Sequence, residues 1–246
     1  MLFSILALAA TVSAAALPEA ALEERQTCRI ATPAELSRAR NAFLREEIIP
    51  ATPAAFNPAN ANLIPDFRPV SALSVSYANK AVELGNKFST LETISQPTFS
   101  FTAEPGFDPA KTKYSLIMAD PDAPNSELPT LSPFLHLIIS DAQAECVGGQ
   151  NRITVAPYMF PTPLSVAPHK YTFLIYRQPP NYVPPPMLQN LPGLRARFPL
   201  LDYVKNNNLT GPIAGNFYLE GLGNIVDLGT RRTAVEKQMS ALEALQ

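Results

Sequence analysis

The chain has 246 residues, of which 46% are hydrophobic and 16% are charged. A chain of this length and composition can bury a core, which excludes intrinsic disorder and a miniature fold held together by disulfides. Its 26 prolines and 10 glycines disfavour a helical bundle and favour short strands joined by long loops, so we expect one mainly β domain. The 19 basic and 21 acidic residues give a net charge of -2, which argues against a nucleic-acid partner.

Residues 1–16 predict a secretory signal peptide. An apolar run over residues 2–16 ends in small side chains, and Ala14 and Ala16 each offer a cleavage point. The run is shorter than the ~20 apolar residues of a transmembrane helix, and no second run of that length follows. We therefore expect a secreted, extracellular protein without a transmembrane segment; the alternative is a hydrophobic N-terminal helix of a cytosolic protein. The charged, aperiodic residues 17–26 favour a short pro-segment that is cut after Arg25.

The chain contains two cysteines, Cys28 and Cys146. In an exported chain this even count predicts one disulfide, and no spacing of Cys and His suggests a metal site. A nucleophilic Cys146 is the alternative, although no histidine lies near it in the sequence. Asn208 begins an Asn-Leu-Thr sequon, which predicts glycosylation on a surface loop.

A helix is expected over residues 33–48. Thr32 and Glu35 form the pattern of a capping box, with proline at the first helical position and apolar side chains at helical spacing behind it. Prolines end this helix, and residues 50–69 lack periodicity, which predicts an extended arm. The pro-segment, the helix and the arm together form residues 17–69, ahead of a β domain over residues 70–225.

Short β-rich segments follow in this domain. Alternating apolar residues predict a hairpin over residues 73–85, and β-branched or aromatic runs predict strands over residues 98–101, 114–119, 134–140, 153–155 and 171–176. Six prolines make residues 178–193 a long loop, and residues 199–206 suit a short helix. The tail over residues 226–246 is amphipathic, which favours a helix that docks on its own domain over one that binds a partner.

Asp120 and Asp122 follow one of these strands, in a segment that Pro121 and Pro124 stiffen. Two carboxylates on a rigid strand end suit a binding site. The alternative is that both only accept hydrogen bonds from the backbone of a proline-rich turn.

The two histidines of the chain both belong to strand regions: His136 lies within an expected strand, and His169 directly precedes another. Because a histidine in so apolar a strand must be hydrogen-bonded, His136 is satisfied either by a core carbonyl or by a carboxylate such as Asp120 together with a bound anion. If Asp120, His136 and His169 converge, they form a small pocket suited to a zwitterionic phosphate headgroup.

These motifs resemble, in order and spacing, the phosphatidylethanolamine-binding protein family. The resemblance rests on Asp-Pro-Asp-Ala-Pro at 120–124, His136, Pro-Tyr at 157–158 with two later prolines, His-Lys-Tyr at 169–171 and Gly-Pro-Ile-Ala-Gly-Asn-Phe-Tyr at 211–218. It spans about residues 70–222. A chain with a signal peptide and an N-terminal helical extension is similar to the secreted fungal members.

The resemblance implies a mainly β fold with a central antiparallel sheet, a second smaller sheet, peripheral helices and a shallow anion pocket. Asp122 and Pro124 are expected to brace the loop of the pocket. Alternation along the strand separately predicts that the Lys170 side chain faces solvent. The ligand-binding residues that the resemblance implies are Asp120, His136, Pro163, His169 and Tyr171.

The first functional hypothesis is a secreted, non-catalytic protein that binds phosphate or a phosphatidylethanolamine-like headgroup such as phosphoethanolamine. We expect it to contain no cofactor and no metal. The alternative is an inhibitor of a serine carboxypeptidase, similar to the carboxypeptidase Y inhibitors. A third hypothesis is a hydrolase that uses Asp120 and His136 as an acid/base pair, but no Gly-x-Ser-x-Gly motif supports it.

Overall fold

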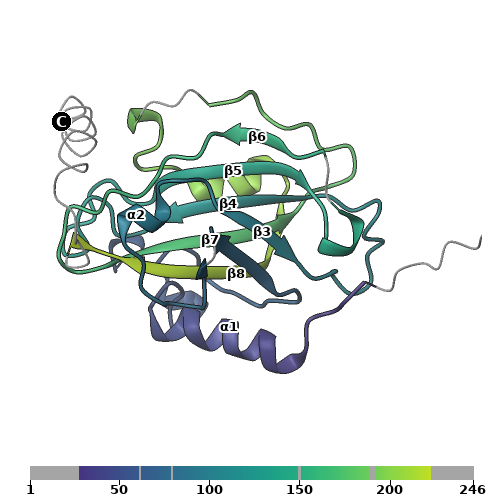
Figure 1. Cartoon of the computed structure of the whole chain (residues 1–246), viewed down its shortest axis with the longest axis horizontal. Coiled ribbons are helices and arrows are strands. Elements are labelled where there is room, and N and C mark those ends of the chain that lie inside the picture. The colour runs from purple at the N-terminus through teal and green to yellow at the C-terminus, as the bar shows by residue number, and fades with distance from the viewer. Residues whose placement is uncertain (1–27, 61, 79, 149–150, 189–191, 223–246) are drawn as a thin grey trace, which may run out of the picture.

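The computed structural model of the chain describes residues 28–222, except residues 61, 79, 149–150 and 189–191 (Figure 1). The expected signal peptide, pro-segment and C-terminal helix lie outside these residues. Within the described part, no helix is both long and apolar enough to cross a membrane.

Two antiparallel sheets form the centre of the molecule. The smaller sheet has the order β2-β1-β3, with β1 (Leu73–Tyr77), β2 (Lys80–Ala81) and β3 (Thr98–Phe101). The larger sheet has the order β6-β5-β4-β7-β8, with β4 (Tyr114–Asp120), β5 (Phe134–Ala142), β6 (Ile153–Ala156), β7 (His169–Arg177) and β8 (Thr210–Glu220). The expected mainly β fold with a larger and a smaller sheet is confirmed.

Three α-helices and four short 3-10 turns lie around the sheets within the described residues. The expected capping box of α1 (Pro33–Arg45) is formed, but the helix ends three residues earlier than expected. Glu47 has a φ of 56°, and the chain turns there to bury Ile48 and Ile49. The other elements are α2 (Thr90–Thr93), α3 (Leu200–Asn206) and the 3-10 turns η1 (Pro53–Ala55), η2 (Pro58–Asn60), η3 (Glu145–Val147) and η4 (Pro192–Leu194).

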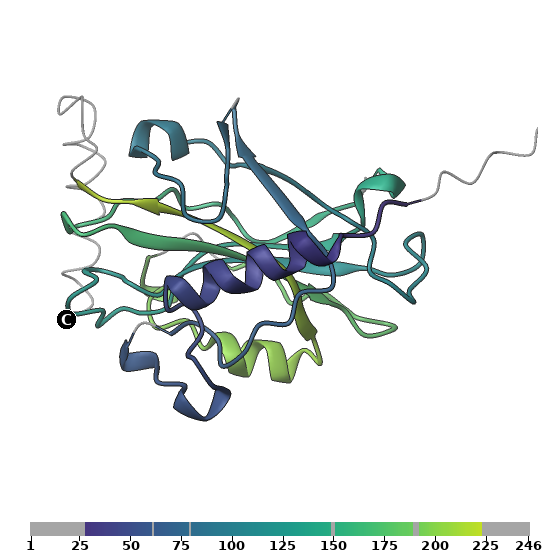
Figure 2. The same cartoon turned by 90° about the horizontal axis from the view of Figure 1, so that it is seen from below.

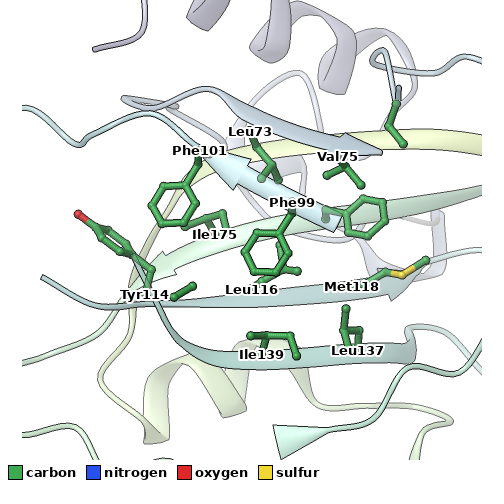
Figure 3. Packing of buried hydrophobic residues seen from close by; sticks show 14 of the residues in the cluster. Leu73, Val75, Phe99, Phe101, Tyr114, Leu116, Met118, Leu137, Ile139 and Ile175 are labelled. Atoms are coloured by element: carbon green, nitrogen blue, oxygen red, sulfur yellow. The ribbon is translucent and has the colours of Figure 1, made fainter. Parts of the chain in front are cut away.

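The central strands of the larger sheet are buried on both faces. On one face, Leu116 and Met118 of β4 pack with neighbouring strands against the smaller sheet (Figure 3). On the other face, Ile117 belongs to a second cluster with Phe43 of α1 and Leu200 of α3. Every residue of β4 and β5 is buried as a result, which explains why their sequences are nearly continuous apolar runs.

Helix α1 packs against the edge strand β8 (Figures 1 and 2). The Phe43 and Phe217 rings meet edge to face with centroids 5.4 Å apart. A Cβ atom at Gly215 would lie 2.7 Å from the Phe43 ring, so this close approach of helix and strand requires glycine.

The predicted disulfide between Cys28 and Cys146 is formed, with Cα atoms 5.3 Å apart. It joins the segment ahead of α1 to the turn η3, which follows β5. The backbone of the same segment is also held, since Ala103 donates a hydrogen bond to the Arg29 carbonyl at 2.9 Å. The N-terminal extension is therefore fixed to the β domain covalently as well as by packing.

Candidate functional site

One small cavity lies at the strand ends where β4 finishes and β5 and β7 begin. Strand pairing creates it, because Asp120 of β4 pairs with Phe134 of β5, and Ala119 pairs with Thr172 of β7. The space open to water molecules in the cavity is about 30 Å³, which exceeds the roughly 10–15 Å³ that one ordered water needs. Its lining includes Asp120, His136, His169 and Tyr171 together with Ala123, Pro124, Leu131, Phe134, Thr162 and Leu164.

A β-bulge determines the position of His136. The register of β4 and β5 shifts between Met118–Leu137 and Ala119–Leu135, so His136 is the extra residue on β5. Such a bulge re-aims a side chain locally. The bulge explains how His136 comes to line a cavity at the strand ends. No signal in the sequence indicates the position of this bulge.

Asp120 and His169 form a buried ion pair. Asp120 Oδ2 lies 2.8 Å from His169 Nδ1, and Asp120 Oδ1 accepts a hydrogen bond from the Asp122 amide at 2.8 Å. On the other side of the ring, the Ser165 hydroxyl lies 3.0 Å from His169 Nε2 and donates its proton to the Ala167 carbonyl. Ser165 must therefore accept from Nε2, so both ring nitrogens of His169 carry protons and the ring is an imidazolium.

The pKa shifts of this pair agree with that protonation state. Burial lowers the pKa of His169, but the charge and the hydrogen bond of Asp120 outweigh burial, so the pKa lies above its ordinary value. Burial likewise raises the pKa of Asp120, but the attraction and hydrogen bond of His169 bring it below its ordinary value. Both shifts therefore favour the charged forms of the two groups.

His136 is held differently. Its Nδ1 donates a hydrogen bond to the Met159 carbonyl at 2.7 Å, as expected for a buried histidine satisfied by a core carbonyl. Its Nε2 is buried and has no hydrogen-bond partner among the described residues. Burial lowers the pKa of His136 to about 4, so the ring is neutral and Nε2 is a free acceptor. The hydrogen bonds of Asp120 go to Asp122 and His169, not to His136.

Asp122 connects the loop after β4 to strand β7. Its carboxylate accepts hydrogen bonds from the Lys170 amide and from Lys170 Nζ, both at 2.7 Å. The Lys170 side chain is only 16% exposed, so the expectation that it faces solvent was wrong. Alternation along the strand places the Lys170 side chain away from the core face. Its ammonium group nevertheless binds the buried carboxylate of Asp122, which keeps most of the side chain out of solvent.

Two prolines lie differently from their expected roles. Pro124, which was expected to brace the loop, lines the cavity directly. Pro163 is buried but is not among the lining residues, where its neighbours Thr162 and Leu164 stand instead. Asn208 is exposed between α3 and β8, a position open to a glycan.

Arg195 supports the cavity from behind and was not expected from the sequence. It is fully buried, and its guanidinium donates hydrogen bonds to the carbonyls of His136 and Pro157. Burial lowers its pKa to about 10, which leaves it charged at neutral pH. Among the described residues, no cluster of three or more His, Cys, Asp or Glu side chains could hold a metal ion.

The packed antiparallel sheets with a polar cavity at the strand ends define a two-sheet β protein. The model of the phosphatidylethanolamine-binding protein family matches residues 66–218, more than half of the chain. The chain belongs to this family.

Individual relatives agree with that assignment. A 26 kDa secreted antigen of Toxocara canis is 33% identical over 155 residues, which are 61% of this chain and 56% of the antigen. The chain thus spans little more than half of that relative.

Two solved structures have the same fold. The structure of carboxypeptidase Y inhibitor complexed with its cognate proteinase has a TM-score of 0.59 at 23% identity, and covers 76% of this chain and 96% of that chain. The phosphatidylethanolamine-binding protein of Plasmodium vivax has a TM-score of 0.57 at 20% identity, and covers 74% of this chain and 96% of that chain. At these identities both comparisons show the fold alone.

Proposed function

We propose that the cavity binds the phosphate group of free phosphate or of a phosphoethanolamine headgroup, without catalysis. The observation that carries the proposal is the buried, unpartnered Nε2 atom of the neutral His136. A buried acceptor without a donor is costly, so a ligand that brings a proton to it gains free energy.

The charge of the site suits a phosphate monoanion. Its remaining P-OH group can donate to His136 Nε2, and the Tyr171 hydroxyl, which has no hydrogen bond to a described residue, can donate to a phosphate oxygen. The neighbouring imidazolium of His169 offsets the charge of Asp120, so the ligand does not meet an uncompensated carboxylate.

The cavity has to open for this ligand. A water-accessible space of about 30 Å³ holds ordered water but is small for a phosphate group. The segment that carries Thr162 and Leu164 has no helix or strand, so movement of these side chains disturbs no backbone ladder. Crystals grown with phosphoethanolamine are expected to contain the phosphate beside His136 with these two side chains displaced.

Calorimetric titration with phosphoethanolamine tests the proposal through its pH dependence. The second pKa of a phosphate monoester is about 6. Because only the monoanion carries the proton for His136, affinity is expected to fall about tenfold per pH unit above pH 6 and to level off between pH 6 and 5. The His136→Asn variant keeps a donor for Met159 but lacks the Nε2 acceptor, and should lose this dependence.

A second pair of variants separates the tyrosine contact from general effects on the strand. Tyr171→Phe should weaken binding about five- to tenfold, the effect of one lost hydrogen bond of ~1 kcal/mol. Tyr176→Phe is the matched control, since Tyr176 lies on the same strand but in the cluster on the opposite face. Binding that is independent of pH and unchanged by both His136→Asn and Tyr171→Phe would refute the proposal.

The absence of catalysis is tested separately with chromogenic carboxylic and phosphoric esters. Turnover by the protein that His136→Asn abolishes would establish the hydrolase hypothesis in its place. No turnover above the buffer rate is expected.

Inhibition of a serine carboxypeptidase is the second candidate function. The small size of the cavity favours it, because a protein that acts through its surface has no need of a large pocket. Titrating the protein against a serine carboxypeptidase distinguishes the two candidates: inhibition that persists in His136→Asn and Tyr171→Phe would place the activity outside the cavity.

We also infer that the protein is secreted. The apolar run over residues 2–16 and the Cys28–Cys146 disulfide support export, since disulfides persist in oxidising compartments. N-terminal sequencing of protein from the culture medium should find a chain that starts near Leu17, or at Gln26 where the pro-segment has been cut after Arg25. Retention of the whole chain inside cells would contradict this.

A further inference from the structure

A second and much larger cavity lies between helix α1 and the smaller sheet, away from the site described above. It has a volume of about 510 Å³. Its lining includes four alanines, Ala39 and Ala42 on the helix and Ala72 and Ala81 on the sheet side. Larger side chains at these positions would fill the space, so the groove follows from the small residues placed there.

The rim of this groove carries positive charge. Arg38 and Arg45 lie seven residues apart on α1, on the same face as Ala42, and both are exposed. Arg38 forms no ion pair with a described residue, and Arg45 forms an ion pair with the adjacent Glu46 at 3.3 Å, with 62% of the Arg45 side chain exposed. The lining contains the arginines Arg29, Arg38 and Arg45 and the glutamates Glu35 and Glu83, so it keeps one positive charge in excess.

We propose that residues 17–25 of the chain itself bind in this groove. Their sequence, Leu-Pro-Glu-Ala-Ala-Leu-Glu-Glu-Arg, carries three glutamates and one arginine, and its leucines and alanines can pack against the alanine side chains of the lining. The charges of the segment and of the rim are thus opposite, and the described chain begins at Cys28 beside Arg29, which lines the groove.

The lengths are compatible. Eleven residues precede Cys28 from Leu17 onward, and an extended chain of that length reaches at most about 36 Å. The 13 residues of α1 extend over only about 20 Å, so the segment can run back along the whole helix. The disulfide fixes the start of the described chain next to the groove. Because the segment belongs to the same chain, its binding is intramolecular, and its effective concentration at the groove is in the millimolar range. Cleavage after Arg25 would release the segment and expose the groove.

Zero-length carbodiimide coupling tests the proposal. The protein used must still contain residues 17–25, and mass spectrometry of its N-terminal peptide verifies this. Arg38→Lys and Arg45→Lys keep the positive charge and introduce an amine that couples to a carboxylate in contact. We expect peptide mapping to find the new lysines joined to Glu19, Glu23 or Glu24, and the yield to fall in 1 M salt.

The matched control is Arg40→Lys. Arg40 lies on the same helix but binds Asp66 at 2.9 Å and does not line the groove. Its replacement should couple to Asp66 and not to the N-terminal segment. Two outcomes would overturn the proposal. In the first, the lysine of the Arg40→Lys control couples to Asp66, but the lysines of the other two variants do not couple to the N-terminal segment. In the second, the coupled products join two isotopically distinct copies of the chain.

Limited trypsin digestion gives an independent readout at Arg25. The double variant Arg38→Gln with Arg45→Gln should release the segment, so cleavage after Arg25 should become at least fivefold faster. Arg68→Gln is the control, because Arg68 is 81% exposed and does not line the groove. Equal rates of cleavage in the double variant and in the unchanged chain would refute intramolecular binding.

Discussion

His169 and Asp120 form an ion pair 2.8 Å long with both side chains no more than 3% exposed, although 49 residues separate them in the sequence. The pair is the centre of the candidate site, and its burial makes it sensitive to the loss of either partner. It also sets how the stability of the protein responds to alkaline pH.

The first prediction is that His169→Gln destabilises the protein by about 3–5 kcal/mol, because it leaves the carboxylate of Asp120 buried without a positive partner. Lys80→Ala is the control: it breaks an exposed pair with Glu92, in which both side chains are about 40% exposed, and should cost at most about 1 kcal/mol. Urea denaturation at pH 7 measures both, and similar losses in the two variants would contradict the role of burial.

The pair also predicts a loss of stability at high pH. The pKa of His169 lies above the ordinary value of 6.5, so its contribution is complete below about pH 6.5 and is lost as the pH rises through the folded-state pKa. A neutral ring has one N-H group and can no longer donate to both Asp120 and Ser165. This alkaline loss should be absent from His169→Gln.

The second prediction concerns His136 at acid pH. Its pKa of about 4 lies below the value of 6.5 in an unfolded chain, so the unfolded state takes up a proton first as the pH falls. Between pH 6.5 and 4 the free energy of unfolding should therefore drop by about 3 kcal/mol from this group alone. His136→Asn should lack this drop, and subtracting its urea curves from those of the unchanged protein removes the contributions of the carboxylates. Parallel curves would show that His136 is not buried in its neutral form.

The third prediction is that replacing Cys28 and Cys146 together by serine lowers the free energy of unfolding by about 4–5 kcal/mol. The disulfide closes a loop with a sequence separation of 118 residues, and the chain-entropy model gives a value of this size for so long a loop. Thermal unfolding of the variant and of the reduced protein should agree. A loss below about 1 kcal/mol would mean that the packing of α1 alone fixes the N-terminal extension.

Much of the sheet could be predicted from the sequence because local signals and burial coincide there. The apolar runs of β4, β5 and β7 were predicted as strands, and the structure buries β4 and β5 completely. Strand β8, the longest in the described chain, was not predicted as a strand. Gly211, Pro212 and Gly215 interrupt its sequence, and its formation depends on pairing with β7 and on close contact with α1.

The site was predictable only in part, because its residues meet through tertiary pairing. The family resemblance implied that Asp120, His136 and His169 converge, and all three line the cavity. The roles of the two histidines could not be foreseen: a bulge on β5 aims one, and Ser165 fixes the protonation of the other. Lys170 was misplaced because strand alternation contains no information about the carboxylate of Asp122 across the loop.

The last prediction is that Arg195→Met destabilises the protein by about 3 kcal/mol and raises the pKa of His136. The guanidinium donates to the carbonyls of His136 and Pro157. The His136 carbonyl keeps the Met159 amide as a donor, so the loss falls on the Pro157 carbonyl, and a carbonyl left without its donor costs about 1–3 kcal/mol. Its positive charge is also one cause of the lowered pKa of His136, after burial, so its removal should make protonation of that ring easier.

Because the chain has only two histidines, an NMR titration of the ring protons can follow His136 directly. Arg197→Met is the matched control, since Arg197 is exposed two residues away and its side chain donates to the Thr130 carbonyl. Its replacement should leave both the stability and the titration of His136 unchanged. If Arg195→Met lowers stability without moving the His136 titration, Arg195 supports the backbone behind the cavity but has no influence on its electrostatics.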